Sequence, residues 1–409
     1  MIELFRGMRL LEFGGGAAGP VSSRYCADHG ATVIRVESRQ RPDFLRILRL
    51  TPDSKGGLDG AEHFSVLNAN KLSVALNLSK PEGVAVARRL ALWADCIAEN
   101  FAPGAMAKWG LEYASLVKDR PDLVMISTCL NGQTGPERHY PGFGGQGSAL
   151  AGFNHLTGWP DREPVGPYGT ITDSLSPRFA TMLLASALLH REETGQGQLI
   201  DLSQVEGGIV CLSEFVVTYT ANGETIDRAG NRSRHAAPHG VFRCLDRPGT
   251  QATDRWVAIA VHDDADWQRL VDVLGRPTWA VDPTLATTAG RLARVGEIEC
   301  HLEGWTRTQT ALDVATRLQA AGVDAGPVED LGDLHDDPQI AHRGHFQPVE
   351  HPILGKHPAE RHAIRFSAME PRLERGAPML GEHTELVLRE LYGMPADEFT
   401  RLRDLGVFE

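Results

Sequence analysis

The sequence predicts an α/β protein with a Rossmann-like large domain, built on a parallel sheet, and a smaller α+β domain. Apolar runs of strand length alternate with helical runs from residue 8 to 128, which is typical of parallel βαβ units. A polar, irregular stretch follows near residue 222, and a shorter series of strands and helices lies behind it. We therefore expect a large domain over 1–222, a linker and small domain over 223–330, and a C-terminal segment, 331–409, that returns to the large domain.

The composition is ordinary for a globular enzyme. The chain has 409 residues, 42% hydrophobic and 23% charged, enough for two domains with a sizeable core. A net charge of −12 without any Lys/Arg block argues against nucleic acid as a partner, although a local basic pocket stays open. The six cysteines are scattered without CxxC spacing, so we expect no zinc site. With no signal-like or membrane-spanning stretch evident, the expected compartment is the cytoplasm.

The chain begins with a βαβ unit. A buried strand, Met8–Phe13, leads into a turn, Gly14–Pro20, then a helix to about Gly30 and a second strand, Thr32–Glu37. The turn matches G-x-G-x-x-G and an acid closes the next strand, which together indicate dinucleotide binding. Proline directly follows the third glycine, however, and no second nucleotide-binding half is evident. Close packing of a tight turn is an equally good interpretation, so a nicotinamide-dependent dehydrogenase and a structural turn both stay open.

Further elements extend the alternation. Residues 38–62 are rich in Arg, Pro, Asp and Gly and are expected to form an irregular loop. The expected strands of the large domain are Val74–Leu78, Cys96–Glu99 and Leu123–Thr128, with a helix at Val84–Ala94. The small domain is expected to contain a strand at Trp256–Ala260 and helices at Asp266–Leu274, Arg291–Trp305 and Thr310–Ala321. The last helix is expected at Glu385–Tyr392.

Asp173 stands out as a candidate functional residue. Small residues and turn formers lead to this acid, and we expect a long apolar helix to begin just behind it at Pro177. The helix should end in the turn Arg191–Gly197, before a short strand that includes Leu199 and Leu202. Backbone N–H groups at a helix entrance favour a carboxylate over the neutral acid. Asp173 is therefore either a helix cap or a nucleophile, and capping is far more common.

Asp-Ser, an apolar helix and then R-x-x-T-G-x-G-Q-x-x-D-L-S resemble the signature of the family III CoA-transferases, also called the CaiB/BaiF family. The resemblance covers essentially the full length. Other segments that resemble family motifs are Ala18–Pro20, Asp28–Ala31, Val33–Glu37, Asn68–Ser73, Asn100–Ala105, Gly230–Phe242, Gly322–Val328 and Ala377–Thr384.

The resemblance implies a role for particular residues. Asp173 would be the catalytic nucleophile. The residues implied at the CoA site are Ala18, Asn100, Phe101, Ala105 and, one helical turn on, Lys108. The residues implied at the substrate site are Ala17, Phe143, Arg232, Arg234, His235 and His239. From the residues alone, Lys108 is equally well a surface lysine, Asn100 a helix cap and the basic stretch a solvated loop.

The resemblance also implies the chemistry. CoA would pass from an acyl-CoA to a carboxylic acid through an aspartyl anhydride and an aspartyl-CoA thioester, with no metal or prosthetic group. Family racemases carry a proton-transferring His where Phe143 stands, which disfavours the alternative of an acyl-CoA racemase. Ala17 replaces a glutamine of formyl-CoA transferase, and the basic stretch suits a dicarboxylic acyl group, above all succinyl. We expect an interlocked homodimer or a heteromer with a related subunit, in which this chain is either active or a non-catalytic partner.

Overall fold

The computed structural model describes residues 3–167, 170–246 and 254–409. The chain divides into two compact units. The large unit consists of Met1–His155, Gly166–Ile226 and Gln339–Glu409, and the small unit of Leu156–Val165 and Asp227–Pro338. The small unit thus takes up a short segment ahead of Asp173 in addition to the stretch that follows residue 226.

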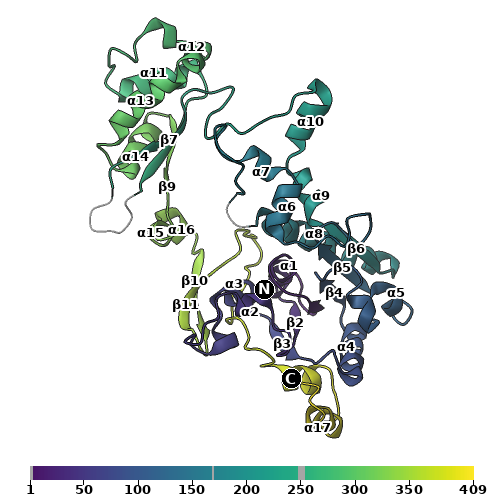
Figure 1. The fold of residues 1–409 in the computed structure, drawn as a ribbon. Coiled ribbons are helices and arrows are strands. Elements are labelled where there is room, and N and C mark those ends of the chain that lie inside the picture. Colours follow the sequence, from purple (N-terminus) through teal and green to yellow (C-terminus); the bar gives the residue numbers. More distant parts are fainter. Residues whose placement is uncertain (1–2, 168–169, 247–253) are drawn as a thin grey trace. The chain divides into compact units, whose positions relative to one another are not determined.

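A six-stranded parallel sheet forms the centre of the large unit (Figure 1), in the order β3-β2-β1-β4-β5-β6. Its strands are β1 Arg9–Phe13, β2 Thr32–Glu37, β3 Leu72–Ala75, β4 Cys96–Glu99, β5 Val124–Cys129 and β6 Gln198–Ser203. All residues of β3, β4 and β5 are buried, as expected for strands of a parallel sheet that is covered on both faces. The strand order reverses between β1 and β4, so a crevice is expected outside the carboxyl ends of these two strands. The predicted α/β class with a parallel sheet is confirmed.

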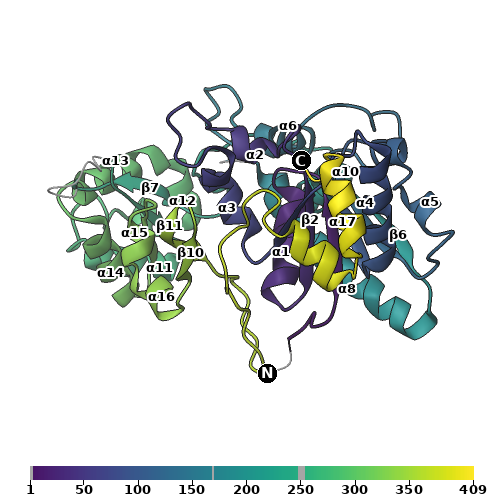
Figure 2. The same cartoon turned by 90° about the horizontal axis from the view of Figure 1, so that it is seen from below.

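Helices cover both faces of this sheet. The long helices are α1 Ala18–Asp28, α4 Pro81–Trp93, α8 Ile171–Thr194, α10 Ser213–Asn222 and α17 Ala396–Asp404. The short ones are α2 Phe44–Ile47, α3 Glu62–Asn68, α5 Tyr113–Leu116, α6 Gly144–Leu150, α9 Gln204–Val210, the 3-10 turns Gly57–Gly60 and Met106–Trp109, and a π-helical turn Leu386–Leu391. Helices α1 and α8 pack on one face through Cys26 and Leu184, and α4 and α17 on the other through Leu90 and Phe399. The C-terminal chain, yellow in Figure 2, lies beside α4, where Arg89 pairs with Glu398.

Several predicted boundaries in the large unit are wrong. Helix α8 begins at Ile171 rather than Pro177, because Thr172 is fully buried and its Oγ1 donates to the carbonyl oxygen of Gly144 at 3.1 Å. Packing of this kind overrides the weak helix propensity of small polar residues. Residues 38–62 contain α2 and a 3-10 turn instead of a plain loop. Strand β3 begins earlier than expected, because buried Lys71 and Ser73 find polar partners inside the sheet.

The C-terminal segment also forms elements that the sequence did not predict. A hairpin joins β10 Phe346–His351 to β11 Gly355–Glu360. Helix α17 then packs Phe399 and Leu402 into the core of the large unit. Among the residues that the structure describes, no helix is long and apolar enough to span a membrane.

The small unit is a three-stranded antiparallel sheet with helices on one face. The sheet has the order β7-β8-β9, with β7 His239–Arg243, β8 Trp256–Ala260 and β9 Asp324–Val328. The helices are α11 Asp264–Val273, α12 Thr288–Ala293, α13 Val295–Thr306, α14 Ala311–Ala320 and α15 Asp333–Asp336. Two short helices, α7 Phe153–Leu156 and α16 Pro338–His342, contain points where the chain passes from one unit to the other. Phe242, Val257 and Ile259 pack with Trp267 in its core. The alternate residues of the strands form the other face.

Candidate active site

The Gly-rich turn that follows β1 is held by Asn100, the residue that directly follows the neighbouring strand β4. Asn100 follows β4, and its Oδ1 accepts from the N–H of Gly15 at 3.1 Å while its Nδ2 donates to the Gly15 carbonyl oxygen at 2.6 Å. Gly14 has a φ of 114°, and a β-carbon there would overlap the Asn100 amide. The glycines are therefore needed for the close approach of Asn100. The role of Asn100 in this structure is to fix the turn.

A buried carboxylate holds the next residue of the turn. Both oxygens of Asp43 accept from the N–H of Gly16, at 3.1 and 3.2 Å, and Asp43 is paired with the guanidinium of Arg35. Arg35 also donates to the Gly14 carbonyl oxygen at 3.0 Å. A pyrophosphate at this turn would have to bind N–H groups that are already used, beside a carboxylate of like charge. This geometry disfavours the dinucleotide interpretation of the turn.

A network of buried charged residues lies next to this turn. Glu12, at the end of β1, is paired with Arg35 and with Lys71, whose Nζ lies 2.8 Å from Glu12 Oε2. Lys71 is fully buried and also donates to the Pro20 carbonyl oxygen and to Asn68 Oδ1, at 2.8 and 2.9 Å. Burial lowers the pKa of Lys71 to about 8 even though the Glu12 carboxylate opposes that shift. These residues tie the first three strands together around the crevice.

Asp173 lies in the first turn of α8, where three neutral groups bond its side chain. The hydroxyl of Thr170, the amide of Gln204 and the backbone N–H of Gly144 all hydrogen-bond the carboxylate. Gln204 is buried at the start of α9, and Gly144 is the first residue of α6. A β-carbon at Gly144 would stand 2.6 Å from Cγ of Asp173, so only glycine fits there. Three elements thus converge on this carboxylate.

The electrostatics of Asp173 differ from the expectation. Burial raises the pKa of Asp173, and the three hydrogen bonds, which lower it, only partly offset that effect. The start of the helix was expected to favour the charged carboxylate. Burial instead raises the pKa of Asp173 by more than the hydrogen bonds lower it. A desolvated carboxylate bonded by neutral donors is a better nucleophile than a hydrated one. Sequence reasoning missed Thr170, Gln204 and Gly144, because their proximity to Asp173 depends on how α6, α8 and α9 pack.

The other predicted site residues of the large unit range from buried to exposed. Ala17 is half-buried at the start of α1, and Ala18 is buried. Phe101 packs edge-on against Trp109, with 5.7 Å between ring centroids, at the border of the core. Ala105 is half-buried, whereas Lys108 is exposed. Phe143 is exposed and directly precedes Gly144. All of them except Lys108 lie in or beside the loops and turns that follow β1, β4 and β5.

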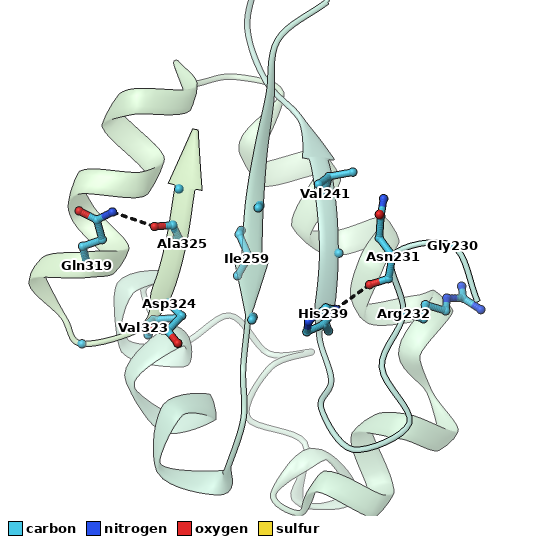
Figure 3. A pocket seen from close by; sticks show the side chains of 15 residues that line it. Gly230, Asn231, Arg232, His239, Val241, Ile259, Gln319, Val323, Asp324 and Ala325 are labelled. Atoms are coloured by element: carbon cyan, nitrogen blue, oxygen red, sulfur yellow. Dashed lines mark hydrogen bonds between the residues drawn. The ribbon is translucent and has the colours of Figure 1, made fainter. Parts of the chain in front are cut away.

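The predicted basic stretch belongs to the small unit. Arg232 already forms a bidentate pair with Glu299, with Nε–Oε1 and Nη2–Oε2 distances of 3.0 and 2.5 Å. Arg234 and His235 are exposed, and His239 Nδ1 lies 2.6 Å from the carbonyl oxygen of Asn231. Arg232, His239 and Asn231 are among the residues that line a cavity of about 750 Å³ on the strands (Figure 3). The floor of this cavity consists of small residues such as Ala258 and Gly326.

Comparison with known proteins decides the family. A family model described as CoA-transferase family III matches residues 5–384. The chain belongs to CoA-transferase family III. The predicted resemblance to this family is thereby confirmed, and so is the prediction that the chain is a CoA-transferase. In the part of this transferase that the structure describes, no group of three or more His, Cys, Asp or Glu side chains is arranged to hold a metal ion.

Relatives of this family III transferase align over nearly its whole length. The chain is 31% identical to succinyl-CoA–D-citramalate CoA-transferase of Chloroflexus aurantiacus over 404 residues, which cover 97% of this chain and 96% of that relative. It is 32% identical over 404 residues to the beta subunit of succinyl-CoA–L-malate CoA-transferase of the same organism, covering 98% and 97%. The crystal structure of a CaiB/BaiF family protein from Brucella suis matches with a TM-score of 0.86 at 30% identity, over 96% of this chain and 100% of that one.

Proposed function

We propose that this CoA-transferase moves CoA from a dicarboxylic acyl-CoA, above all succinyl-CoA, to a carboxylic acid, with Asp173 as the nucleophile. The observation that carries the proposal is the Asp173 carboxylate, partly buried, in contact with Gly144 and bonded by three neutral donors next to the carboxyl edge of the sheet. The names of the two Chloroflexus relatives support succinyl-CoA as the donor. The acceptor acid is open.

The reaction would proceed in two symmetrical halves. An oxygen of the Asp173 carboxylate attacks the thioester carbonyl, the C–S bond breaks, and the CoA thiolate leaves a mixed anhydride behind. The thiolate then attacks the aspartyl carbonyl, which releases the donor acid and forms an aspartyl-CoA thioester. The acceptor carboxylate then attacks the aspartyl carbonyl of that thioester and expels the CoA thiolate, which leaves a second mixed anhydride. The thiolate attacks the acceptor's carbonyl carbon in this anhydride, which forms the new acyl-CoA and releases the Asp173 carboxylate. A covalent route of this kind divides one difficult exchange into easier steps.

The hydrogen-bond donors around Asp173 have a use in each step. In this proposal, the Gly144 N–H and the Gln204 amide, which bond the resting carboxylate, would bond the oxyanion that forms when the aspartyl carbonyl carbon is attacked. Donors of this kind are effective because they are positioned before the reaction begins. Neither group needs to gain or lose a proton.

A trapping experiment tests the nucleophile. The wild-type protein is incubated with succinyl-CoA and quenched with hydroxylamine, which converts an aspartyl thioester or anhydride into a hydroxamate. Peptide mass spectrometry should locate the hydroxamate on Asp173, and only when the donor is present. A hydroxamate on another residue, or none during measurable transfer, would contradict the assignment.

Binding measurements separate the transferase from the dehydrogenase alternative. Calorimetric titration should detect CoA binding and no NAD(H) binding, since the N–H groups of Gly15 and Gly16 are occupied by Asn100 and Asp43. Tight NAD(H) binding without CoA binding would reverse this conclusion.

We also propose that the working enzyme contains more than one chain. Helix α10 has no buried residue and exposes Val216, Val217 and Tyr219, an apolar surface suited to a partner. A homodimer and a pair of unlike subunits are both consistent with this surface, and relatives named alpha and beta subunits exist. A chain that binds CoA but transfers it only after mixing with an unlike subunit would identify a non-catalytic partner.

A further inference from the structure

Two exposed aromatic rings meet at the loop whose next residue, Gly144, lies against the Asp173 carboxylate. Phe44 and Phe143 have ring centroids 5.4 Å apart, and 37% and 67% of their respective surfaces are exposed. Phe143 lies one peptide unit from Gly144, whose N–H bonds Asp173. Large apolar side chains are usually covered, so two exposed ones in contact near a candidate active site indicate a surface that binds an apolar group.

The backbone around Phe44 fixes the position of its ring. Phe44 is the first residue of α2, and the carboxylate of Asp43 caps this helix by accepting from the N–H of Leu45 at 2.8 Å. The same carboxylate holds the N–H of Gly16. The ring rests on Gly16, where a β-carbon would stand 2.5 Å from Cε1 of Phe44. Phe44 is thus attached to the same turn that Asn100 and Arg35 hold.

Phe143 is fixed from the other side of the site. Its backbone is extended, with a φ of −118°, and its N–H donates to Oε1 of Gln146 at 2.9 Å. The next residue begins α6 and is pressed against Asp173. The two rings therefore come from the loops behind β2 and β5, and both are anchored to groups that also position the site.

The chemistry of this surface indicates what it would contact. The groups that bond Asp173 are neutral, and the two rings of the adjoining loops are apolar, so none of these residues offers a charged partner to a second carboxylate. In a dicarboxylic acyl group with methylenes, the carbons next to the reacting carbonyl are hydrocarbon and the second carboxylate is further away. An oxalyl group has no such carbons. The rings therefore match the methylene segment.

We propose that Phe44 and Phe143 are specificity-determining residues: together they form the apolar wall that binds the methylene segment of the acyl group attached to Asp173. The inference rests on the proposed function, because it requires an acyl group on Asp173. It adds a substrate class, acyl groups with hydrocarbon next to the carbonyl, to which oxalyl does not belong. One methylene more or less in an apolar site changes kcat/KM by about tenfold or more.

A donor series with constant terminal charge tests the inference. Oxalyl-, malonyl-, succinyl- and glutaryl-CoA differ only in the number of methylenes, and each is assayed with wild type, Phe44→Ala and Phe143→Ala. For wild type, kcat/KM should rise from oxalyl- to succinyl-CoA. In either variant it should fall about tenfold for succinyl-CoA, mainly through KM, and change less than twofold for oxalyl-CoA. Leu189→Ala is the control, since Leu189 is an exposed apolar residue on α8, about 24 Å along the helix from Asp173.

The outcomes separate this inference from the proposed function. If the four donors keep the same order of kcat/KM in both variants, or if kcat/KM falls equally for all four, the proposed apolar wall is wrong. Transfer by Asp173 would be unaffected by that result. A wild type that transfers CoA from none of the donors would overturn the proposed function and the inference with it. Phe44→Leu and Phe143→Leu keep an apolar side chain and guard against misfolding; they should retain the rise from oxalyl- to succinyl-CoA, and its loss in them would also contradict the wall.

Discussion

The backbone of Gly144 lies so close to the Asp173 carboxylate that a β-carbon at position 144 would overlap Oδ2 and stand 2.6 Å from Cγ. Gly144 starts α6 and Asp173 lies in the first turn of α8, so this contact fixes where the candidate nucleophile lies relative to two helices. The same glycine donates its N–H to the carboxylate. A single position thus combines the fit and the hydrogen bond.

Gly144→Ala should therefore inactivate the enzyme. The new methyl group displaces the carboxylate, and a misplacement of about 1 Å can cost about 100-fold in rate. Gly145→Ala is the matched control, since a β-carbon there meets nothing within 4 Å. Steady-state transfer rates of the two variants decide the matter. Equal activities would mean that the Gly144–Asp173 contact has no catalytic consequence.

Asp173→Asn should abolish transfer without destabilising the fold at pH 7. The folded protein raises the pKa of Asp173, so its charge costs stability at neutral pH and ceases to cost it when the group is protonated. The free energy of unfolding of the variant should therefore equal or exceed that of wild type at pH 7. The difference in the free energy of unfolding between the variant and wild type should become smaller as the pH falls towards 4. Denaturant titrations at two pH values can measure it. A variant that is less stable than wild type by about 1 kcal/mol would indicate instead that the carboxylate is mainly a helix cap.

The pH profile of transfer should depend on Gln204. Asp173 must be ionised to attack, so kcat/KM should fall as the pH drops through the raised pKa of Asp173. The Gln204 hydrogen bond lowers that pKa, so Gln204→Leu should move the acid limb of the profile to higher pH. Gln196→Leu, at an exposed turn behind α8, is the control and should leave the limb in place. A limb that does not move in Gln204→Leu would contradict the assigned hydrogen bond.

Lys71→Met should destabilise the large unit strongly. Lys71 is fully buried and pairs with Glu12 at 2.8 Å, so its removal leaves a buried carboxylate with less compensation. Breaking a buried pair in this way costs about 3–5 kcal/mol. Lys118→Met, at an exposed lysine, should change the free energy of unfolding by less than about 0.5 kcal/mol. Similar denaturation midpoints for both variants would mean that the Lys71 network contributes little.

The basic stretch of the small unit should discriminate between acyl donors. Wild type should prefer succinyl-CoA over butyryl-CoA, because only the former keeps a carboxylate that an arginine can bind. Arg232→Ala and Arg234→Ala should each reduce turnover of succinyl-CoA about tenfold and leave turnover of butyryl-CoA unchanged. Arg276→Ala, an exposed arginine paired within its own segment, is the control. Equal wild-type rates with both donors, or no selective loss in either variant, would remove the dicarboxylate hypothesis.

Local patterns were enough to predict much of the architecture. Largely apolar strands alternating with helices indicated the parallel sheet, because a strand buried on both faces is mostly apolar. The predicted element boundaries were less accurate where buried polar residues stabilise the end of a helix or strand. Thr172 extends α8 by six residues, and Lys71 and Ser73 lie inside β3 or beside it, because each finds a hydrogen-bond partner that is distant in sequence.

The sequence by itself determined the family and the candidate nucleophile, since the Asp173 unit is a contiguous motif whose residues need no partner to be recognised. Only the tertiary structure decided what surrounds that nucleophile. Gly144 and Gln204 reach Asp173 from other helices, and the Gly-rich turn directs its N–H groups to Asn100 and Asp43. The physical reason is the same in each case: desolvation and hydrogen bonding depend on distances in space, and the partners that set them lie 27 to 85 residues apart along the chain.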